Sequence, residues 1–220
     1  MKKVQVRLIQ RREAWVLTSQ GWAVTLLCGM AAMIFILGNL YPFLALNSPV
    51  KADILVVEGW LPDYAVKSAI AEFKLGNYRQ LITTGLPVEK GYYLAEYKNF
   101  AELTAATCIA LGFERDRVIA VPAPNVIKHR TSAAAIALRD WLSTSELKVK
   151  AINLYSLGAH SRRSWLIFQA VLSPEIQVGV IAAAPQDYDP NFWWKSSAGF
   201  RTVIDEFIAY IYARFIDWKV

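Results

Sequence analysis

The segment between Trp22 and Leu46 contains no charged residue, and it constrains this chain more than any other feature. About 20 consecutive apolar residues cross the hydrocarbon core of a bilayer as a helix, so the segment is long enough to span it. A signal peptide has a shorter apolar region, of roughly 7–15 residues, and ends in a small-x-small site. The sequence FLALNSPV offers only a poor site of that kind. We therefore predict a transmembrane anchor at residues 22–46, in preference to a cleaved signal peptide or a buried core helix.

Basic residues gather on the N-terminal side of this segment. They are Lys2, Lys3, Arg7, Arg11 and Arg12. On the other side, Lys51 and Asp53 nearly cancel. Because Lys and Arg beside a span favour the cytoplasm, residues 1–21 are expected inside and residues 51–220 outside. The formal net charge of +6 is then partly a topology signal, and no basic stripe with interleaved aromatic residues points to nucleic-acid binding.

The two cysteines predict neither a disulfide nor a metal site. Cys28 lies inside the apolar segment and Cys108 in an expected helix, so they cannot meet. A lone buried cysteine usually acts as a small apolar residue. No spacing of Cys, His or Glu suggests a metal ligand set, and the sequence specifies no cofactor.

Residues 51–220 alternate continuous apolar runs with helical patterns. The runs cover residues 52–59, 80–85, 118–124, 149–158 and 178–185, and the last of them looks buried on both faces. The helical patterns cover residues 62–76, 99–111, 130–142, 160–172 and about 199–216. Continuous apolar strands separated by helices are typical of a parallel sheet with helices on both faces. We predict a three-layer, Rossmann-like α/β domain with a mostly parallel five-stranded sheet.

The two histidines fall at equivalent strand-to-helix junctions. His160 follows Gly158 at the end of the fourth strand, and His129 precedes the third helix. The carboxyl ends of parallel strands meet at one edge of the sheet, where ligands bind. Helix N-termini attract anions there, and arginine can hold a phosphate through two parallel hydrogen bonds. The sequence therefore predicts an anion-binding site at this edge.

Several residues beside the histidines are candidates for binding that anion. They are Lys128, His129, Arg130, Thr131 and Arg163, with Gly59, Gly85 and Gly158 at strand ends. Arg163 is preferred over Arg162 because position i+3 returns to the helix face of His160. Thr131 is also expected to be the N-cap of the third helix. His129 could equally be an exposed loop residue.

His160 and Glu58 are the candidate catalytic residues. The ordinary pKa of histidine lies near neutrality, so His160 suits a general acid or base. Glu58 ends the first strand and would orient a histidine or activate water, or else form a structural ion pair with an arginine. Asp187 and Asp189 follow the fifth strand, where they would either close the crevice or serve turn formation.

These motifs resemble the ElyC/SanA/YdcF family of bacterial envelope proteins. The resemblance is carried by VVEGW, TTG (83–85), RT (130–131), HSRR (160–163) and the C-terminal helix with Glu206. The sequence departs from many members after the first strand, where Glu58-Gly59-Trp60 replaces a glycine-rich turn. It also carries Asn125, Lys128 and Arg130 where many members have glutamate, serine and asparagine. The resemblance implies a single-pass protein of the bacterial inner membrane, with an extracytoplasmic Rossmann-like domain linked to peptidoglycan or lipid-carrier metabolism.

Three functional hypotheses follow. The first is binding of a phosphorylated ligand, such as a lipid-linked glycan precursor, with His-assisted hydrolysis or transfer. It requires His160, Arg163 and Arg130 to converge in one pocket. The second is a non-enzymatic scaffold with protein partners in envelope or exopolysaccharide assembly, which predicts that these cations scatter or pair with carboxylates. The third is an S-adenosylmethionine-dependent or nucleotide-binding enzyme, which lacks support because no G-x-G-x-x-G loop follows the first strand.

Overall fold

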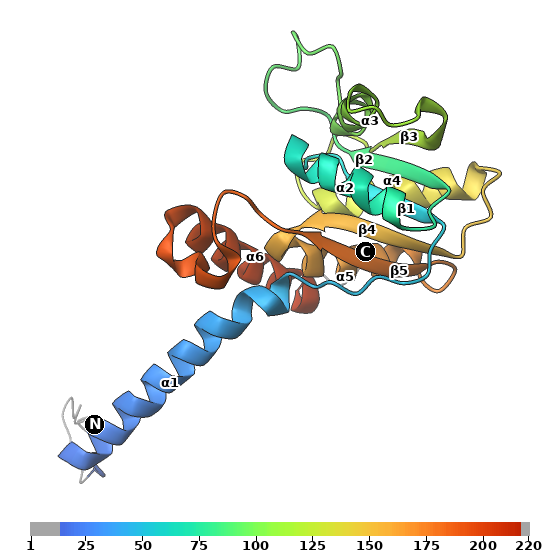
Figure 1. Ribbon diagram of the computed structural model, residues 1–220. Coiled ribbons are helices and arrows are strands. Elements are labelled where there is room, and N and C mark those ends of the chain that lie inside the picture. Colours follow the sequence, from blue (N-terminus) through green and yellow to red (C-terminus); the bar gives the residue numbers. More distant parts are fainter. Residues whose placement is uncertain (1–13, 217–220) are drawn as a thin grey trace, which may run out of the picture. The chain divides into compact units, whose positions relative to one another are not determined.

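The computed structural model describes residues 14–216 (Figure 1). The chain divides into two compact units, Met1–Leu37 and Gly38–Val220. Most of helix α1 (Ser19–Leu44) belongs to the first unit. It begins beside Thr18, whose Oγ1 accepts a hydrogen bond from the backbone N–H of Gly21 at 3.1 Å. Within the described residues, α1 is the one helix long and apolar enough to cross a membrane, a property that a signal sequence shares.

Five parallel strands form the centre of the second unit. They are β1 (Ile54–Glu58), β2 (Gln80–Gly85), β3 (Val118–Pro122), β4 (Ala151–Leu157) and β5 (Gln177–Ala183). Their order in the sheet is β3-β2-β1-β4-β5, and every neighbouring pair is parallel. The structure thus confirms the predicted α/β fold with a five-stranded parallel sheet.

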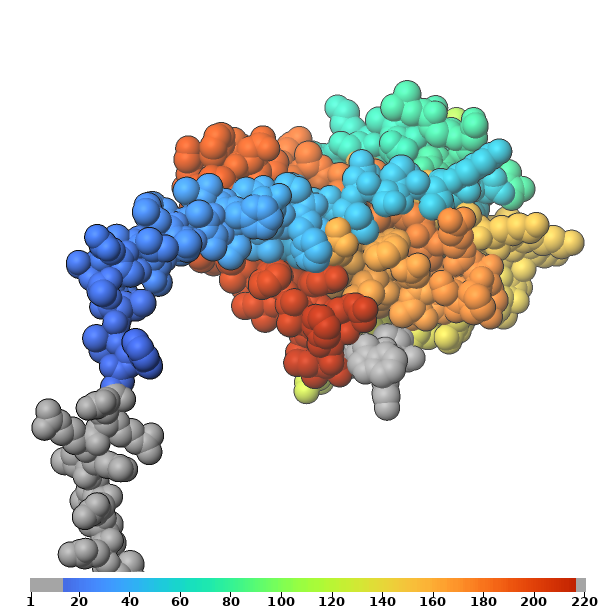
Figure 2. Space-filling view, turned by 90° about the horizontal axis from the view of Figure 1, so that it is seen from below, coloured from blue at the N-terminus to red at the C-terminus, as the bar shows by residue number. Residues whose placement is uncertain are grey.

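Helices cover both faces of the sheet and its carboxyl edge. They are α2 (Asp63–Leu75), α3 (Phe100–Ala110), α4 (Arg130–Thr144), α5 (Ser161–Leu172) and α6 (Ser197–Phe215), with 3-10 helices η1 (Arg115–Arg117), η2 (Gly158–His160) and η3 (Pro190–Lys195). Helices α2 and α3 share one apolar core with the sheet, and α4 and α5 share the other. Helix α6 packs against α5, η2 and η3, and its residues reach the surface of this unit, where they are red in Figure 2.

The two cores explain why the central strands read as continuous apolar runs. In β1, Ile54 and Val56 face α4 and α5, whereas Leu55 and Val57 face α2 and α3. Burial on both faces leaves no polar alternation in such a strand. The fifth strand differs from the prediction, because Ile181 and Ala182 are partly exposed. The reason is that β5 lies at the edge of the sheet, where one neighbouring strand is missing.

The strand order defines a crevice at the carboxyl edge. From β1 the chain builds β2 and β3 on one side, and then crosses over to build β4 and β5 on the other. Connections therefore diverge between β1 and β4, the position where open α/β sheets bind ligands. Glu58 ends β1 there, and Leu157 ends β4.

The segment that leads from α1 to β1 is fixed along the edge of the sheet. Ser48 pairs with Val180 of β5 in antiparallel register. The buried side chain of Asn153 accepts a hydrogen bond from the Val50 N–H and donates one to the Val50 carbonyl, both at 2.8 Å. The Asn153 side chain thus makes the two hydrogen bonds to Val50 that the backbone of a neighbouring strand would otherwise make.

Candidate functional site

A cavity of about 1100 Å³ lies at the carboxyl edge of the sheet. Eight residues predicted for the site line it: Glu58, Gly85, Lys128, His129, Arg130, Thr131, His160 and Arg163. Gly59 and Gly158, which were also predicted, are not among the lining residues. Apolar side chains complete the lining, among them Leu86, Phe100, Ile127, Ile167, Ile208 and Tyr212.

The turn after β4 places His160 at the floor of this cavity. Gly158 adopts a φ of 45°, which favours glycine, and the chain then forms the short helix η2. A Cβ on Gly158 would lie 3.2 Å from the Tyr41 hydroxyl, so this glycine serves the turn and its packing. Helix α5 begins at Ser161, one residue later than the sequence predicted, because η2 precedes it. Ser161 Oγ donates to the Gly158 carbonyl at 2.8 Å and closes the turn.

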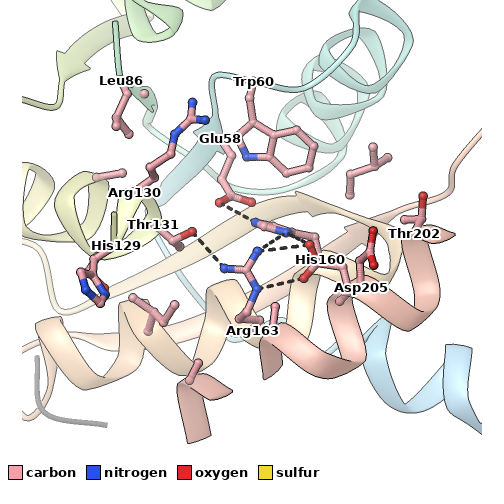
Figure 3. A pocket seen from close by; sticks show the side chains of 18 of the residues that line it. Glu58, Trp60, Leu86, His129, Arg130, Thr131, His160, Arg163, Thr202 and Asp205 are labelled. Carbon is pink, nitrogen blue, oxygen red and sulfur yellow. Dashed lines mark hydrogen bonds and ion pairs between the residues drawn. The ribbon is translucent and has the colours of Figure 1, made fainter. Parts of the chain in front are cut away.

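Two carboxylates flank the imidazole ring of His160, as Figure 3 shows for Glu58. Nδ1 lies 2.8 Å from Glu206 Oε1, and Nε2 lies 3.7 Å from Glu58 Oε1. The ring also makes an edge contact with Trp60, at 4.8 Å between ring centroids. Nε2 is buried and has no hydrogen-bond partner among the described residues. The ring is therefore hydrogen-bonded through Nδ1, whereas Nε2 is buried beside Glu58 without a hydrogen bond.

This environment keeps His160 charged. Burial would lower its pKa, but the negative charge of Glu58 and the hydrogen bond to Glu206 raise the pKa to about 9. Both ring nitrogens then carry protons at neutral pH, and Nδ1 donates to Glu206. Arg163 Nη2, 2.9 Å from Nδ1, cannot donate to a protonated nitrogen. The two donors instead share Glu206 Oε1, which Nη2 contacts at 3.1 Å.

Arg163 and Glu206 form a two-pronged ion pair between α5 and α6. Besides the Nη2 contact, Arg163 Nε donates to Glu206 Oε2 at 2.9 Å. Burial would raise the pKa of Glu206, but the hydrogen bond from His160 and the charge of Arg163 help lower it to about 2. Arg163 Nη1 also donates to Thr131 Oγ1 of α4 at 3.4 Å. One guanidinium therefore connects three helices around the cavity floor.

Glu58 is buried at the end of β1 and receives hydroxyl donors from two neighbouring elements. Ser164 Oγ of α5 donates to Oε1 at 2.9 Å, and Ser156 Oγ of β4 donates to Oε2. Burial would raise the pKa of Glu58, but the charge of His160 and these hydrogen bonds hold it below its ordinary value. Glu58 is thus an ionised carboxylate whose oxygens are already engaged.

The start of α4 forms a more exposed, cationic rim. Lys128, His129 and Arg130 are exposed, and Arg130 forms an ion pair with Glu89 of the loop before α3. Thr131 is not the N-cap that the sequence predicted. The N-cap position is His129, two residues earlier and in the left-handed conformation, so α4 begins at Arg130, and the Thr131 hydroxyl lies within the first turn and meets Arg163.

Some of the remaining predicted residues line the cavity, and the others pack against neighbouring elements or cap a helix. Gly59 and Gly85 pack against the start of α3, where added Cβ atoms would lie 2.6 Å from the Phe100 carbonyl oxygen and 2.8 Å from its Cβ, respectively. Arg162 lies outside the cavity lining and stacks on the Phe43 ring at 4.1 Å. Asp187 lines the cavity, whereas Asp189 caps η3 through the Asn191 N–H at 2.8 Å.

Several residues of the site were missing from the predicted set. Glu206 is the most important of them, and Ser156, Ser164 and Trp60 also contact the charged cluster; Glu206 and Trp60 had been named only within the motifs of the family resemblance. Only Ser164 carried a local signal, since position i+4 shares the helix face of His160. Within residues 14–216, no three His, Cys, Asp or Glu side chains gather as a metal-ligand group.

Comparisons of this chain with models of known protein families and with curated proteins find no match. Its function is therefore inferred from the geometry and charge of the cavity.

Proposed function

We propose that this chain is a membrane-anchored envelope-biogenesis protein of the ElyC/SanA/YdcF type whose cavity binds a phosphorylated amphiphile, such as a lipid-linked glycan precursor. The apolar α1 would be the anchor, and the basic residues before it support an N-terminus in the cytoplasm and an extracytoplasmic domain. Cations at one rim of the cavity and apolar side chains along its walls suit a ligand with an anionic head and an apolar tail.

The observation that carries this proposal is the Nε2–H of His160, which has no hydrogen-bond partner within residues 14–216 although Glu58 Oε1 lies 3.7 Å away. A buried donor without an acceptor costs about 1–3 kcal/mol. This donor belongs to a protonated ring at neutral pH, and it lies at the floor of a cavity large enough for a ligand. A phosphate oxygen is the acceptor best suited to a cationic donor, because the hydrogen bond is then charge-assisted.

The rim would supply the rest of the phosphate contacts. The ion pair of Arg130 with Glu89 joins two well-exposed side chains, and such pairs are weak. Arg130 can therefore exchange Glu89 for a ligand at small cost, and Lys128 lies beside it. Arg163 is already bound to Glu206, so its proposed role is to hold His160 and Thr131 in place rather than to bind phosphate directly.

If the ligand is turned over, His160 would act as the general acid. Its charged ring would donate the Nε2 proton to the leaving oxygen of a phosphoester. Glu58 accepts hydrogen bonds from two serines, so it would stabilise the charged ring rather than act as a free base, and the proton of the attacking water would pass to an oxygen of the departing phosphate.

The second candidate is a scaffold that binds envelope-assembly proteins. One observation favours it: the three cations converge on the cavity, but each also has a carboxylate partner. Exposed Tyr93 and Leu94 in the loop before α3 would suit a protein contact. A nucleotide or S-adenosylmethionine ligand has less support, because β2 ends in Thr84 and Gly85 rather than in an acidic residue.

The test is ligand binding by the full chain in detergent. We expect a polyprenyl phosphate to raise the Tm, and the uncharged polyprenol and S-adenosylmethionine to have little effect. His160→Gln and Arg130→Gln should each weaken polyprenyl phosphate binding about tenfold, the loss of roughly 1.4 kcal/mol. Arg139→Gln is the matched control, since Arg139 pairs with Asp140 on α4 outside the cavity lining. Binding that depends on neither substitution, or no binding of any phosphorylated ligand, would overturn the proposal and favour the scaffold.

A further inference from the structure

The cavity carries opposite charges on its two sides. The start of α4 contributes Lys128 and Arg130, whereas the loop after β5 and helix α6 contribute Asp187 and Asp205. In Figure 3, Arg130 and Asp205 lie on different sides of the His160 ring, whose own charged neighbours balance one another. A ligand that fills the cavity therefore meets cations on one side and carboxylate acceptors on the other.

Glu206 fixes which face of α6 turns toward the cavity. Its carboxylate contacts His160 Nδ1 at 2.8 Å. Thr202 precedes Glu206 by four positions, so the two side chains lie on one helix face, about 5–6 Å apart between their Cβ atoms. Thr202 and Asp205 are three positions apart and line the cavity together. Their oxygens therefore lie within one helical turn of the group that holds His160.

The loop after β5 brings a second carboxylate to the same side. Tyr188 follows Asp187 and packs against the first turn of α6, where a Cβ added to Gly199 would lie 2.9 Å from the Tyr188 ring. We call the three exposed, polar lining residues on this side the acidic wall. They are Asp187, Thr202 and Asp205, and their side chains make no hydrogen bond or ion pair within residues 14–216.

A partly exposed tryptophan also belongs to this side of the cavity. Trp60 lies in the turn after β1, and its ring makes the edge contact with His160 at an interplanar angle of 72°. The side chain lines the cavity and is 40% exposed. In Figure 3 it lies above His160, toward Asp205. Ligand sites combine such aromatic surfaces with a few polar groups that fix the orientation of the ligand.

The size and charge of the cavity exclude a bare phosphate as the group that fills it. Its volume of about 1100 Å³ reaches the upper end of the range of roughly 300–1000 Å³ that is usual for small-molecule sites. A phosphate would be repelled by Asp187 and Asp205, so it belongs near His160 and the cations of α4. The group attached to that phosphate must then face the acidic wall, and it must offer hydrogen-bond donors to carboxylates that only accept.

We infer that the acidic wall and Trp60 bind a sugar that the ligand carries on its phosphate. The inference rests on the proposed function, because it places the phosphate at His160. Sugar hydroxyls donate to Asp187 and Asp205 and can both donate to and accept from Thr202, while the C–H groups of the sugar ring pack on the indole. An ammonium group fits less well, since it offers no acceptor to Thr202 and is repelled by the charged imidazole. The ligand class is therefore a glycosyl phosphate.

The experiment compares lipids that differ only in the group on the phosphate. The Kd of the full chain in detergent is measured for polyprenyl phosphate, for its glucosyl ester and for its ethanolamine ester, all with the same polyprenyl chain. We expect the glucosyl ester to bind at least tenfold more tightly than polyprenyl phosphate. The cations alone predict the opposite order, because a phosphodiester carries one negative charge and a phosphomonoester carries up to two at neutral pH.

Variants of the acidic wall test which residues carry the preference. Asp187→Ala and Asp205→Ala should each reduce the ratio of the two Kd values at least threefold. Trp60→Leu should reduce it as well, whereas Trp60→Phe, which retains a flat ring, should restore most of it. Asp116→Ala is the matched control, because Asp116 is an exposed aspartate outside the cavity lining. Equal Tm values establish that the variants are folded.

The possible results separate this inference from the proposed function. A parent chain that binds none of the three lipids would refute the proposed function and the inference with it. Binding of polyprenyl phosphate as tight as that of the glucosyl ester would refute only the sugar site. A preference that survives both aspartate substitutions would place the sugar elsewhere and overturn the assignment. Tightest binding of the ethanolamine ester would assign the acidic wall to an ammonium group and overturn it too.

Discussion

At the scale of single residues, the site is organised around one buried cation with two carboxylates. Burial alone would neutralise His160, but Glu58 and Glu206 stabilise its charged form from opposite sides. Arg163 supplies the second positive charge of the cluster, so four charged groups balance one another. A balanced cluster does not attract anions by net charge, so the proposed ligand would be recognised through the Nε2–H of His160, which lacks a hydrogen bond among the described residues.

Replacing Glu206 by Gln should lower the pKa of His160. The substitution removes the hydrogen-bonded carboxylate from Nδ1 and leaves Arg163 as an unbalanced neighbouring cation. We expect the pKa to fall from about 9 by at least one unit, measured from the imidazole resonances as a function of pH. Asp205→Asn, the adjacent acidic position in the cavity lining, is the control and should leave the pKa almost unchanged. An unchanged pKa in Glu206→Gln would show that the carboxylate is not a partner of His160 in solution.

The same pKa shift predicts how stability depends on pH. The raised pKa means that the folded state binds the His160 proton more tightly than the unfolded chain, whose histidine titrates near pH 6.5. This stabilisation, on the order of 3 kcal/mol, is fully present below pH 6.5 and is lost as the pH rises through about 9. The Glu206→Gln variant should therefore show a shallower decline in its free energy of unfolding across that range.

At the scale of helices and strands, the fold was predictable because the sheet is buried on both faces. The apolar runs at residues 52–59 and 80–85 contain β1 and β2, and the pattern of proline and glycine around residues 62–76 marks α2. Each of these signals is local. A strand between two helical layers must be continuously apolar wherever its partners lie in the sequence.

The pairing within the site was not predictable in the same way. His160 and Glu206 are separated by 46 positions, and they meet because α6 packs across α5 at the carboxyl edge. No local pattern around either residue specifies that crossing. For the same reason, the positive charges beside His160 suggested a net cationic site, whereas their carboxylate partners come from other elements.

Gly179 of β5 provides a test of how the segment after α1 is attached. A Cβ at this position would lie 2.6 Å from the Val50 backbone nitrogen and still closer to Asn153 Oδ1. Gly179→Ala should therefore displace the segment, break its hydrogen bonds to Asn153 and lower the free energy of unfolding by about 1–3 kcal/mol. Chemical denaturation of the full chain in detergent measures the change. Gly38→Ala is the control, because no atom lies within 4 Å of its added Cβ, and equal stabilities would refute this tight packing.

At the scale of the whole molecule, the chain consists of one unit that holds most of the apolar helix and a second unit that holds the α/β fold. The basic residues at positions 2–12 lie outside the described residues and precede α1 in the sequence, and the segment after α1 carries little net charge. Because the positive flank determines which end of a span stays in the cytoplasm, the charges of residues 1–12 are expected to determine on which side of the membrane the cavity works.

The proposed orientation can be tested by protease accessibility. Protease added to intact spheroplasts should degrade residues 51–220 of the full chain, because the proposed orientation puts the α/β unit outside. Replacing Lys2, Lys3, Arg7, Arg11 and Arg12 by Gln while adding arginines after Leu46 should protect a substantial fraction of the chains, since the positive flank then follows the span. Replacing the same five residues by Lys or Arg of the other type keeps the charge and should leave the degradation unchanged. Protection of the parent chain would place the cavity in the cytoplasm, where a phosphorylated ligand would have to be presented at the inner leaflet.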